Sequence, residues 1–114
     1  MRFIVMGMAT KESEAGPPPK PEDFAAMQKY NEEAAKAGVL LAAEGLGPTS
    51  KGARVKFSGD KRTVIDGPFT ETKELTGGFA LIEVKSREEA IEWAKRFRKI
   101  VGDGDSLVQE VFGG

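Results

Sequence analysis

The central segment of the chain reads Asp66-Gly67-Pro68-Phe69-Thr70-Glu71-Thr72-Lys73-Glu74 and lies between two runs whose residue types are those of β-strands. Its first turn is rigid, because proline fixes one backbone angle and glycine accepts conformations that other residues avoid. Asp66 is placed to accept amide protons of its own turn, and Phe69 is expected to anchor the loop in apolar surroundings. The segment is either an architectural corner, at a dimer contact, or a ligand-binding rim that presents Thr70, Lys73 and Glu74.

A β-hairpin is predicted immediately before this segment. Ala53 to Phe57 alternates apolar and polar residues, Ser58-Gly59-Asp60 supplies a turn, and Arg62 to Asp66 resumes the strand. The hairpin is locally basic through Lys51, Arg54, Lys56, Lys61 and Arg62. No aromatic side chain interleaves with them on the polar face, whereas proteins that bind single-stranded nucleic acid stack bases on aromatics. We therefore expect a solvated hairpin that binds no nucleic acid specifically.

Four further strands are predicted. Arg2 to Met8, Val39 to Leu46 and Gly78 to Val84 are short apolar runs, and Ser106 to Phe112 follows the last helix. These runs are apolar on both faces rather than on one. Such strands belong to a sheet that is covered on both sides.

Two helices are predicted between these strands. The first begins near Pro21, whose fixed φ suits a first helical turn, and ends at Gly38. The second begins with a capping box formed by Ser86 and Glu89, and it ends at Gly102. Each carries apolar residues at helical spacing and is expected to pack on the sheet.

The segment from Lys11 to Lys20 contains the three successive prolines Pro17 to Pro19 and is predicted to be a stiff loop, or alternatively a flap over a cleft. Tyr30 on the first helix is interpreted as an amphipathic residue at the edge of the core, with a ligand-binding phenol as the alternative. Trp93 on the second helix is interpreted as core rather than as a platform for a ligand.

Glu44 is the anomalous residue of the Val39 to Leu46 strand. Alternation along the strand predicts that it shares a face with Leu40, Ala42 and Leu46. Either the carboxylate lies at a wet strand end and pairs with lysine or backbone amides, or it is partly buried and suited to proton transfer. Glu44 and Asp66 are the candidate catalytic residues, and Tyr30 is a candidate ligand-binding residue.

The order strand, helix, strand, hairpin, strand, helix, strand predicts an α+β fold: a ferredoxin-like split β-α-β sandwich with an inserted β-hairpin, as a single domain over residues 1–114. Two helices cover only one face of such a sheet. Because the strands are apolar on both faces, the second face is expected to pack on another copy of the chain. The sequence therefore predicts a homodimer joined through the sheet face.

Composition excludes several classes of function. The 18 acidic and 17 basic residues nearly cancel, so no global field attracts nucleic acid or an anionic membrane. The chain has no cysteine and no histidine, which removes thiolate chemistry and the commonest general base. No apolar run approaches the roughly 18 residues of a membrane helix. We expect a soluble, cytoplasmic protein without a membrane partner, a cofactor or a metal, since the carboxylate spacing is not diagnostic for Mg²⁺ or Mn²⁺.

The Asp66 to Glu74 segment, followed by Gly77-Gly78-Phe79, resembles the signature of the DGPF branch of the YCII-related proteins. Ala43-Glu44-Gly45-Leu46 resembles the family's usual glutamate-glycine-leucine, and Glu88 to Ala94 resembles its second helix. The resemblance implies a dimeric α+β barrel of ferredoxin-like subunits. It also implies genes that are often neighbours of alternative sigma factors, and a biochemical role that is largely undefined.

In the YCII branch a histidine and an aspartate in a cleft have been suggested as an acid-base pair, which this chain, lacking histidine, does not carry. The positions that match the family's motifs are Glu44, Asp66, Gly67, Pro68, Phe69, Thr70, Lys73 and Glu74. Two functions stay open: a small-molecule-binding or accessory module linked to stress regulation, and an enzyme with carboxylate acid-base catalysis in a cleft near Glu44 and the loop. The first is preferred.

Overall fold

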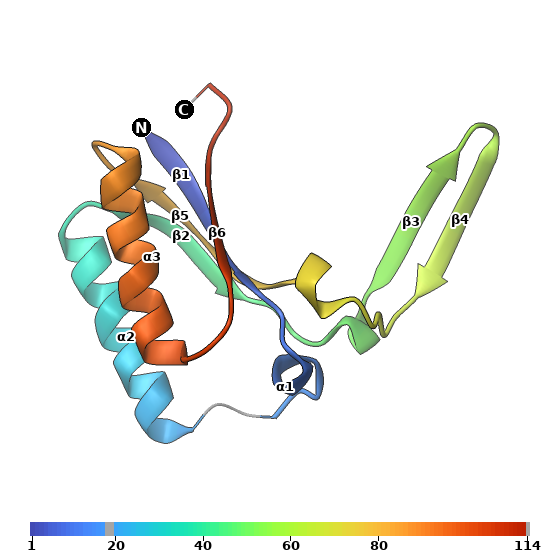
Figure 1. The fold of residues 1–114 in the computed structure, drawn as a ribbon, viewed down its shortest axis with the longest axis horizontal. Coiled ribbons are helices and arrows are strands. Elements are labelled where there is room, and N and C mark those ends of the chain that lie inside the picture. Colours follow the sequence, from blue (N-terminus) through green and yellow to red (C-terminus); the bar gives the residue numbers. More distant parts are fainter. Residues whose placement is uncertain (18–19, 114) are drawn as a thin grey trace.

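A four-stranded antiparallel sheet organises the chain (Figure 1). The computed structural model describes residues 1–17 and 20–113. The sheet consists of β1 (Arg2–Met8), β2 (Leu40–Gly45), β5 (Thr76–Glu83) and β6 (Ser106–Glu110) in the order β2-β5-β1-β6. The strands of the two β-α-β units therefore interleave in one antiparallel sheet, and the fold is mixed α+β.

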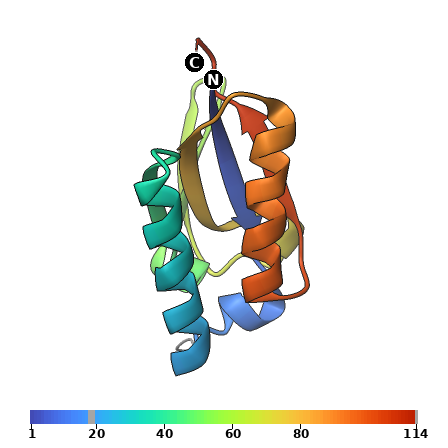
Figure 2. The same ribbon diagram turned by 90° about the vertical axis from the view of Figure 1, so that its left-hand side faces the viewer.

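Two long helices, α2 (Pro21–Lys36) and α3 (Arg87–Val101), lie side by side on one face of this sheet (Figure 2). The predicted starts are confirmed: Pro21 occupies the first turn of α2, and the Ser86 side chain accepts the Glu89 amide proton at 3.1 Å. Gly102, with φ of 89°, follows the end of α3. None of the helices among the described residues combines the length and apolar character that a membrane crossing requires.

The core lies between α3 and the sheet. Side chains alternate along β1, so that Phe3 and Val5 are buried beneath the helices while Ile4 and Met6 turn to the other face. Small residues of α3 let the helix approach the strands closely. The core cluster consists of Phe3, Val5, Val39, Ile82, Val84, Ala90 and Ala94.

The opposite side of the sheet, which we call the open face, has neither α2 nor α3 on it (Figure 2). Its side chains follow from the strand register, which pairs Ile4 with Leu81 and Met6 with both Phe79 and Leu107. These residues are half-buried, apart from Leu107, which is exposed. The prediction that both sheet faces are apolar is therefore confirmed.

The hairpin arm, residues 53–66, consists of β3 (Ala53–Ser58) and β4 (Lys61–Asp66) and forms a separate two-stranded sheet. It projects from the side of the main sheet opposite the helices (Figures 1 and 2). Gly59, with φ of 60°, and Asp60 make the turn. The predicted hairpin is confirmed, and each of its strand residues is exposed.

The prediction of a loop from Lys11 onward is wrong at its start, where α1 (Lys11–Glu14) forms. Thr10 and Ser13 make a reciprocal capping box, in which each side chain accepts the other residue's amide proton. This local hydrogen bonding outweighs the helix-breaking prolines that follow. Pro18 and Pro19 lie outside the described residues.

The prediction that Leu40 shares a face with Ala42 and Glu44 is also wrong. Leu40 pairs with Ile82 and Ala42 pairs with Leu81, so the register shifts at Leu41. An extra residue in an edge strand reverses the alternation beyond it. Ala43 therefore shares the helix-covered face with its partner Ala80.

Candidate ligand-binding pocket

A pocket of about 560 Å³ lies between the helices and the sheet. We call it the helix–sheet pocket. Its helical wall carries the aromatic side chains of Tyr30, Trp93 and Phe97, and its other wall is formed by β1, β2 and β5. Polar residues also line it, namely Thr10, Ser13, Asn31, Glu44, Arg98 and Asp103.

The aromatic wall is held by a bond between the two helices. The Tyr30 hydroxyl of α2 donates to the Trp93 carbonyl oxygen of α3 at 2.8 Å. The Tyr30 ring meets Trp93 edge-on at 5.8 Å between centroids and lies 6.4 Å from Phe97. Burial raises the pKa of Tyr30, opposed by the weaker effect of the Arg96 cation. Tyr30 is therefore a neutral phenol whose proton is already donated, and it contributes its ring to the pocket.

Arg96 covers the outer side of this wall. Its guanidinium lies 4.5 Å from the Trp93 ring centroid and 5.5 Å from that of Tyr30, and it forms an ion pair with Glu33 of α2. Cations are attracted to aromatic ring faces. Arg96 thereby adds a second link between α2 and α3 at the rings that line the pocket.

Glu44 lies at the edge of the helix–sheet pocket, at the end of β2. The register pairs it with Phe79 of the open face, whereas its neighbour Ala43 pairs with Ala80 of the helix-covered face. Alternation therefore directs the Glu44 carboxylate away from the helices, and the residue is exposed. This is the wet strand end that the sequence left open as one of two interpretations.

The corner at Gly67 requires glycine. A Cβ atom there would lie 1.7 Å from the Thr49 carbonyl oxygen, a distance that no side chain tolerates. The Gly67 amide donates to the Gly52 carbonyl at 3.0 Å, and the Gly67–Pro68 peptide bond is cis. The corner thus packs directly on η1 (Thr49–Lys51), a short 3₁₀ turn before the hairpin arm.

Thr49 and Glu14 fasten the loop, and neither was singled out from the sequence. The Phe69 amide donates to Thr49 Oγ1 at 2.9 Å, and that hydroxyl donates to Glu14 Oε2 at 2.5 Å. The Thr49 amide also donates to the Glu14 carboxylate, 3.2 Å from each oxygen. The only signal in the sequence is the Thr10-to-Ser13 cap that positions Glu14 on α1. The partners are 35 residues apart, so no local pattern connects them.

The remaining residues of the motif lie outside the helix–sheet pocket. Asp66 is the exposed last residue of β4, and in the described part of the chain its carboxylate accepts no hydrogen bond. Thr70 and the η2 (Thr72–Glu74) residues Lys73 and Glu74 are exposed too. None of these four lines the helix–sheet pocket, which does include Glu44 and Tyr30. Phe69 is half-buried, with the Arg54 guanidinium 4.7 Å from its ring centroid, so its anchoring role is that of a loop contact.

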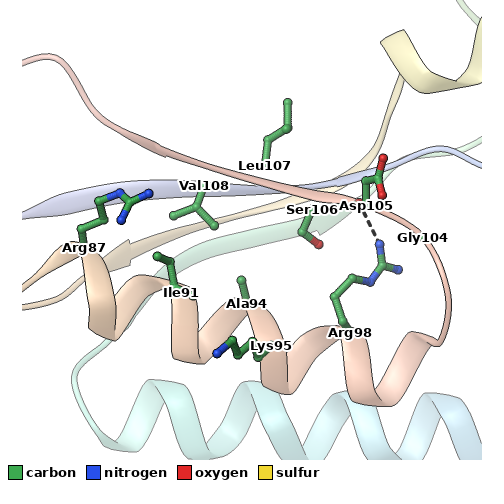
Figure 3. A pocket seen from close by; sticks show the side chains of 10 residues that line it. All are labelled: Arg87, Ile91, Ala94, Lys95, Arg98, Gly104, Asp105, Ser106, Leu107 and Val108. Carbon is green, nitrogen blue, oxygen red and sulfur yellow. Dashed lines mark hydrogen bonds between the residues drawn. The ribbon is translucent and has the colours of Figure 1, made fainter.

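A second, shallower hollow of about 510 Å³ runs between α3 and β6 (Figure 3). Arg98 reaches across it and donates to the Asp105 carbonyl oxygen at 2.8 Å, which also accepts the Met8 amide proton. A Cβ atom on Gly104 would lie 3.0 Å from the Arg98 guanidinium. Arg98 therefore fixes the turn into β6 and separates this hollow from the helix–sheet pocket, which it also lines.

Metal coordination finds no support in this geometry. Among residues 1–17 and 20–113, no three side chains of histidine, cysteine, aspartate or glutamate gather closely enough to hold an ion. The carboxylates of the motif point into solvent on different short elements.

The YCII-related domain matches residues 1–104. The chain belongs to the YCII-related family. An uncharacterised protein of Rhizobium meliloti (strain 1021), R00369, is 40% identical over 73 residues, which cover 64% of this chain and 56% of the relative. The chain thus spans little more than half the length of that relative.

A solved structure has the same fold. It is the 5-chloro-2-hydroxyhydroquinone dehydrochlorinase TftG of Burkholderia phenoliruptrix AC1100, in complex with 2,5-dihydroxybenzoquinone. The match covers 97% of this chain and 93% of the dehydrochlorinase, with a TM-score of 0.53 and 19% sequence identity. At that identity the similarity establishes the fold alone.

Proposed function

We propose that this protein is a homodimeric small-molecule-binding module of the YCII-related family and that its ligand occupies the helix–sheet pocket. The observation that carries the proposal is the pocket itself, with an aromatic wall and polar groups around it. Its volume of about 560 Å³ lies within the roughly 300 to 1,000 Å³ typical of ligand pockets. An accessory role in stress-linked regulation, which the DGPF resemblance implies, is compatible with ligand sensing.

The lining favours a planar, largely apolar ligand with one or two polar substituents. The rings of Tyr30, Trp93 and Phe97 offer flat apolar surface. Among the described residues, the side-chain amide of Asn31 makes no hydrogen bond. The Thr10 hydroxyl accepts the Ser13 amide proton but does not donate its own. Both side chains therefore have an N–H or O–H group that can bind the ligand. Tyr30 does not, because its proton is donated to Trp93.

The homodimer is supported by the open face. Ile4, Met6, Phe79, Leu81 and Leu107 place apolar side chains on the side of the sheet that faces away from α2 and α3. Contiguous apolar surface of this kind marks an interaction site in soluble proteins. Packing of two open faces would give the dimeric α+β barrel that the family resemblance implies.

Trp93 is the only tryptophan of the chain and lines the pocket, so its fluorescence reports on binding. The first probe is 2,5-dihydroxybenzoquinone, the compound in the dehydrochlorinase structure, and other planar phenols and aromatic acids form the panel. Titration calorimetry measures the affinity independently. Ala43→Leu fills the pocket from β2 and is expected to abolish binding, whereas Ala35→Leu, at an exposed position of α2 outside the pocket, leaves binding unchanged. Equal binding by both variants would reject the pocket.

The second candidate is an enzyme that uses a carboxylate as general base. It is favoured by Glu44 and Asp103 at the pocket and by the fold shared with a dehydrochlorinase. In this mechanism Glu44 accepts a proton from the substrate, and Asp66 holds the Asp66 to Glu74 loop in place. The outward direction of the Glu44 side chain makes it the less favoured proposal. Turnover by the unmodified chain that Glu44→Gln abolishes, and that the control Glu22→Gln at an exposed position outside the pocket retains, would establish it.

A further inference from the structure

The two faces of the hairpin arm differ: one carries three large apolar residues together with Arg62, and the other carries Arg54, Lys56 and Lys61. The register pairs Val55 with Val64 and Phe57 with Arg62 on the first face, and Arg54 with Ile65 and Lys56 with Thr63 on the second. On the apolar face Val55 is 65% exposed, Phe57 68% and Val64 68%. This face contains three of the six cross-strand pairs, and its three large apolar side chains are neighbours in adjacent pairs, so they form one exposed apolar patch.

In the described part of the chain, no element buries the hairpin arm. Every residue of β3 and β4 is exposed, and the two strands form a sheet of their own. A two-stranded hairpin with nothing packed on it is at best marginally stable in water. Its base is nevertheless fixed by the Gly67 amide bond to Gly52 and by the Thr49 contact to Phe69. The arm is therefore held in one direction from a rigid root.

The net charges of the arm and of the rest of the chain have opposite signs, which indicates the partner that binds the arm. The hairpin arm, residues 53–66, contains four basic and two acidic side chains, a net charge of +2. The rest of the chain contains thirteen basic and sixteen acidic side chains, a net charge of −3. The body of a second copy is thus electrostatically complementary to the arm, whereas the arm of a second copy is not.

The direction of the hairpin arm also points to a second copy of the chain as its partner. The arm projects on the side of the main sheet that carries the open face, away from α2 and α3 (Figures 1 and 2). A second copy seated on the open face would lie beside the arm. Two-fold symmetry then gives each copy an arm along the other, which adds apolar area at both ends of the interface.

We propose that the hairpin arm clasps a second copy of this chain, with the face formed by Val55, Phe57 and Val64 against the body of that copy. The inference rests on the homodimer of the proposed function and adds a second, separate contact to it. The arm is in this reading a dimerisation element rather than a nucleic-acid-binding hairpin.

Val64→Ser and Ile65→Ser provide a matched pair, because the two residues are neighbours in β4 and face opposite sides of the arm. Sedimentation equilibrium of the full chain measures the dimer dissociation constant. Val64→Ser removes two buried valines from a symmetric dimer and should raise that constant by about tenfold or more. Ile65→Ser should change it less than about threefold. Equal effects, or none, would overturn the arm contact.

A photo-crosslinking residue in place of Phe57 tests the contact without weakening it. Irradiation is expected to give a covalent dimer whose cross-link maps to residues outside 53–66 of the other copy. Cross-links confined to one chain, to a second arm or to added DNA would overturn the proposal.

The outcomes separate the inference from the function on which it rests. A wild-type monomer at micromolar concentration removes the homodimer and the arm contact together, while ligand binding to the helix–sheet pocket is measured independently by Trp93 fluorescence. A wild-type dimer that Val64→Ser leaves intact removes the arm contact alone.

Discussion

Phe3 and Phe57 occupy equivalent places in two sheets of the same chain, yet Phe3 is 3% exposed and Phe57 is 68% exposed. Both lie on strands that alternate in the same way, and both belong to the apolar face of their sheet. The main sheet has α2 and α3 on that face, whereas the hairpin arm has no described element on it. An alternating pattern therefore identifies an apolar face without identifying what covers it.

The two regions meet at a small polar junction. Gly67 packs on Thr49, and Thr49 joins the Phe69 amide to the Glu14 carboxylate. The junction fixes the direction of the arm although the arm has no core of its own. By this geometry the corner from Asp66 to Phe69 is the root of the hairpin arm.

The largest expected effect tests the difference between the two phenylalanines. Phe3→Ala should lower the free energy of unfolding by about 3 to 5 kcal/mol, because it leaves a cavity in the core. Phe57→Ala should lower it by less than about 0.5 kcal/mol in the monomer, since the ring is exposed there. Urea unfolding at several protein concentrations measures both. A loss from Phe57→Ala that persists at the lowest concentration would show that the arm is covered within its own chain.

The second prediction tests the junction. Gly67→Ala should lower the free energy of unfolding by about 3 kcal/mol or more, because its Cβ overlaps the Thr49 backbone and both segments must move. Gly47→Ala is the matched control, as a Cβ there meets no atom within 4 Å. Thermal unfolding of the two variants distinguishes them. Equal stability would mean that the corner adapts freely and that the arm is not held at its root.

The sequence predicted what local chemistry determines. Pro21, the Ser86 and Glu89 cap and the Gly59 turn specify element ends within a few residues, so the helices and the hairpin arm were identified correctly. The extra residue at Leu41 was missed, because the apolar run around it reads equally well in either register.

The candidate site was predicted only in part, because it depends on packing between distant segments. Tyr30 lines the helix–sheet pocket as one of the two interpretations allowed, but its hydroxyl bond to Trp93 is not visible in either helix alone. Glu44 borders the pocket, while Asp66, Thr70, Lys73 and Glu74 do not. Their predicted roles in ligand binding or catalysis stay predictions.

A third prediction concerns the hydroxyl at the centre of the junction. Thr49→Val keeps the shape of the side chain and should lower the free energy of unfolding by about 1 to 3 kcal/mol, because the Phe69 amide and the Glu14 carboxylate each lose a partner. Thr63→Val, on the exposed arm, should change it by less than about 0.5 kcal/mol. Chemical unfolding measures both variants. Similar losses of unfolding free energy would mean that the Gly67 packing, and not the Thr49 hydroxyl, keeps the loop in place.

The smallest expected effect concerns Tyr30 of α2, the only tyrosine of the chain. Burial raises the pKa of Tyr30 above its ordinary value of 10.0. In the unfolded chain the phenol therefore ionises first, and the stabilisation is fully present below pH 10 and is lost as pH rises through the folded-state pKa. Tyr30→Phe should cost about 1 kcal/mol at neutral pH, by loss of the bond to the Trp93 carbonyl.

The pH dependence separates this bond from the lysines that also titrate in alkali. Both wild type and Tyr30→Phe should lose stability above pH 10, and the difference between them should shrink there, since only the wild type has a phenol to ionise. The ultraviolet absorbance of tyrosinate, which arises from Tyr30 alone, should appear at higher pH in the folded protein than in urea. Coincident titrations would show that the ring is solvated and that the pocket wall is open at this point.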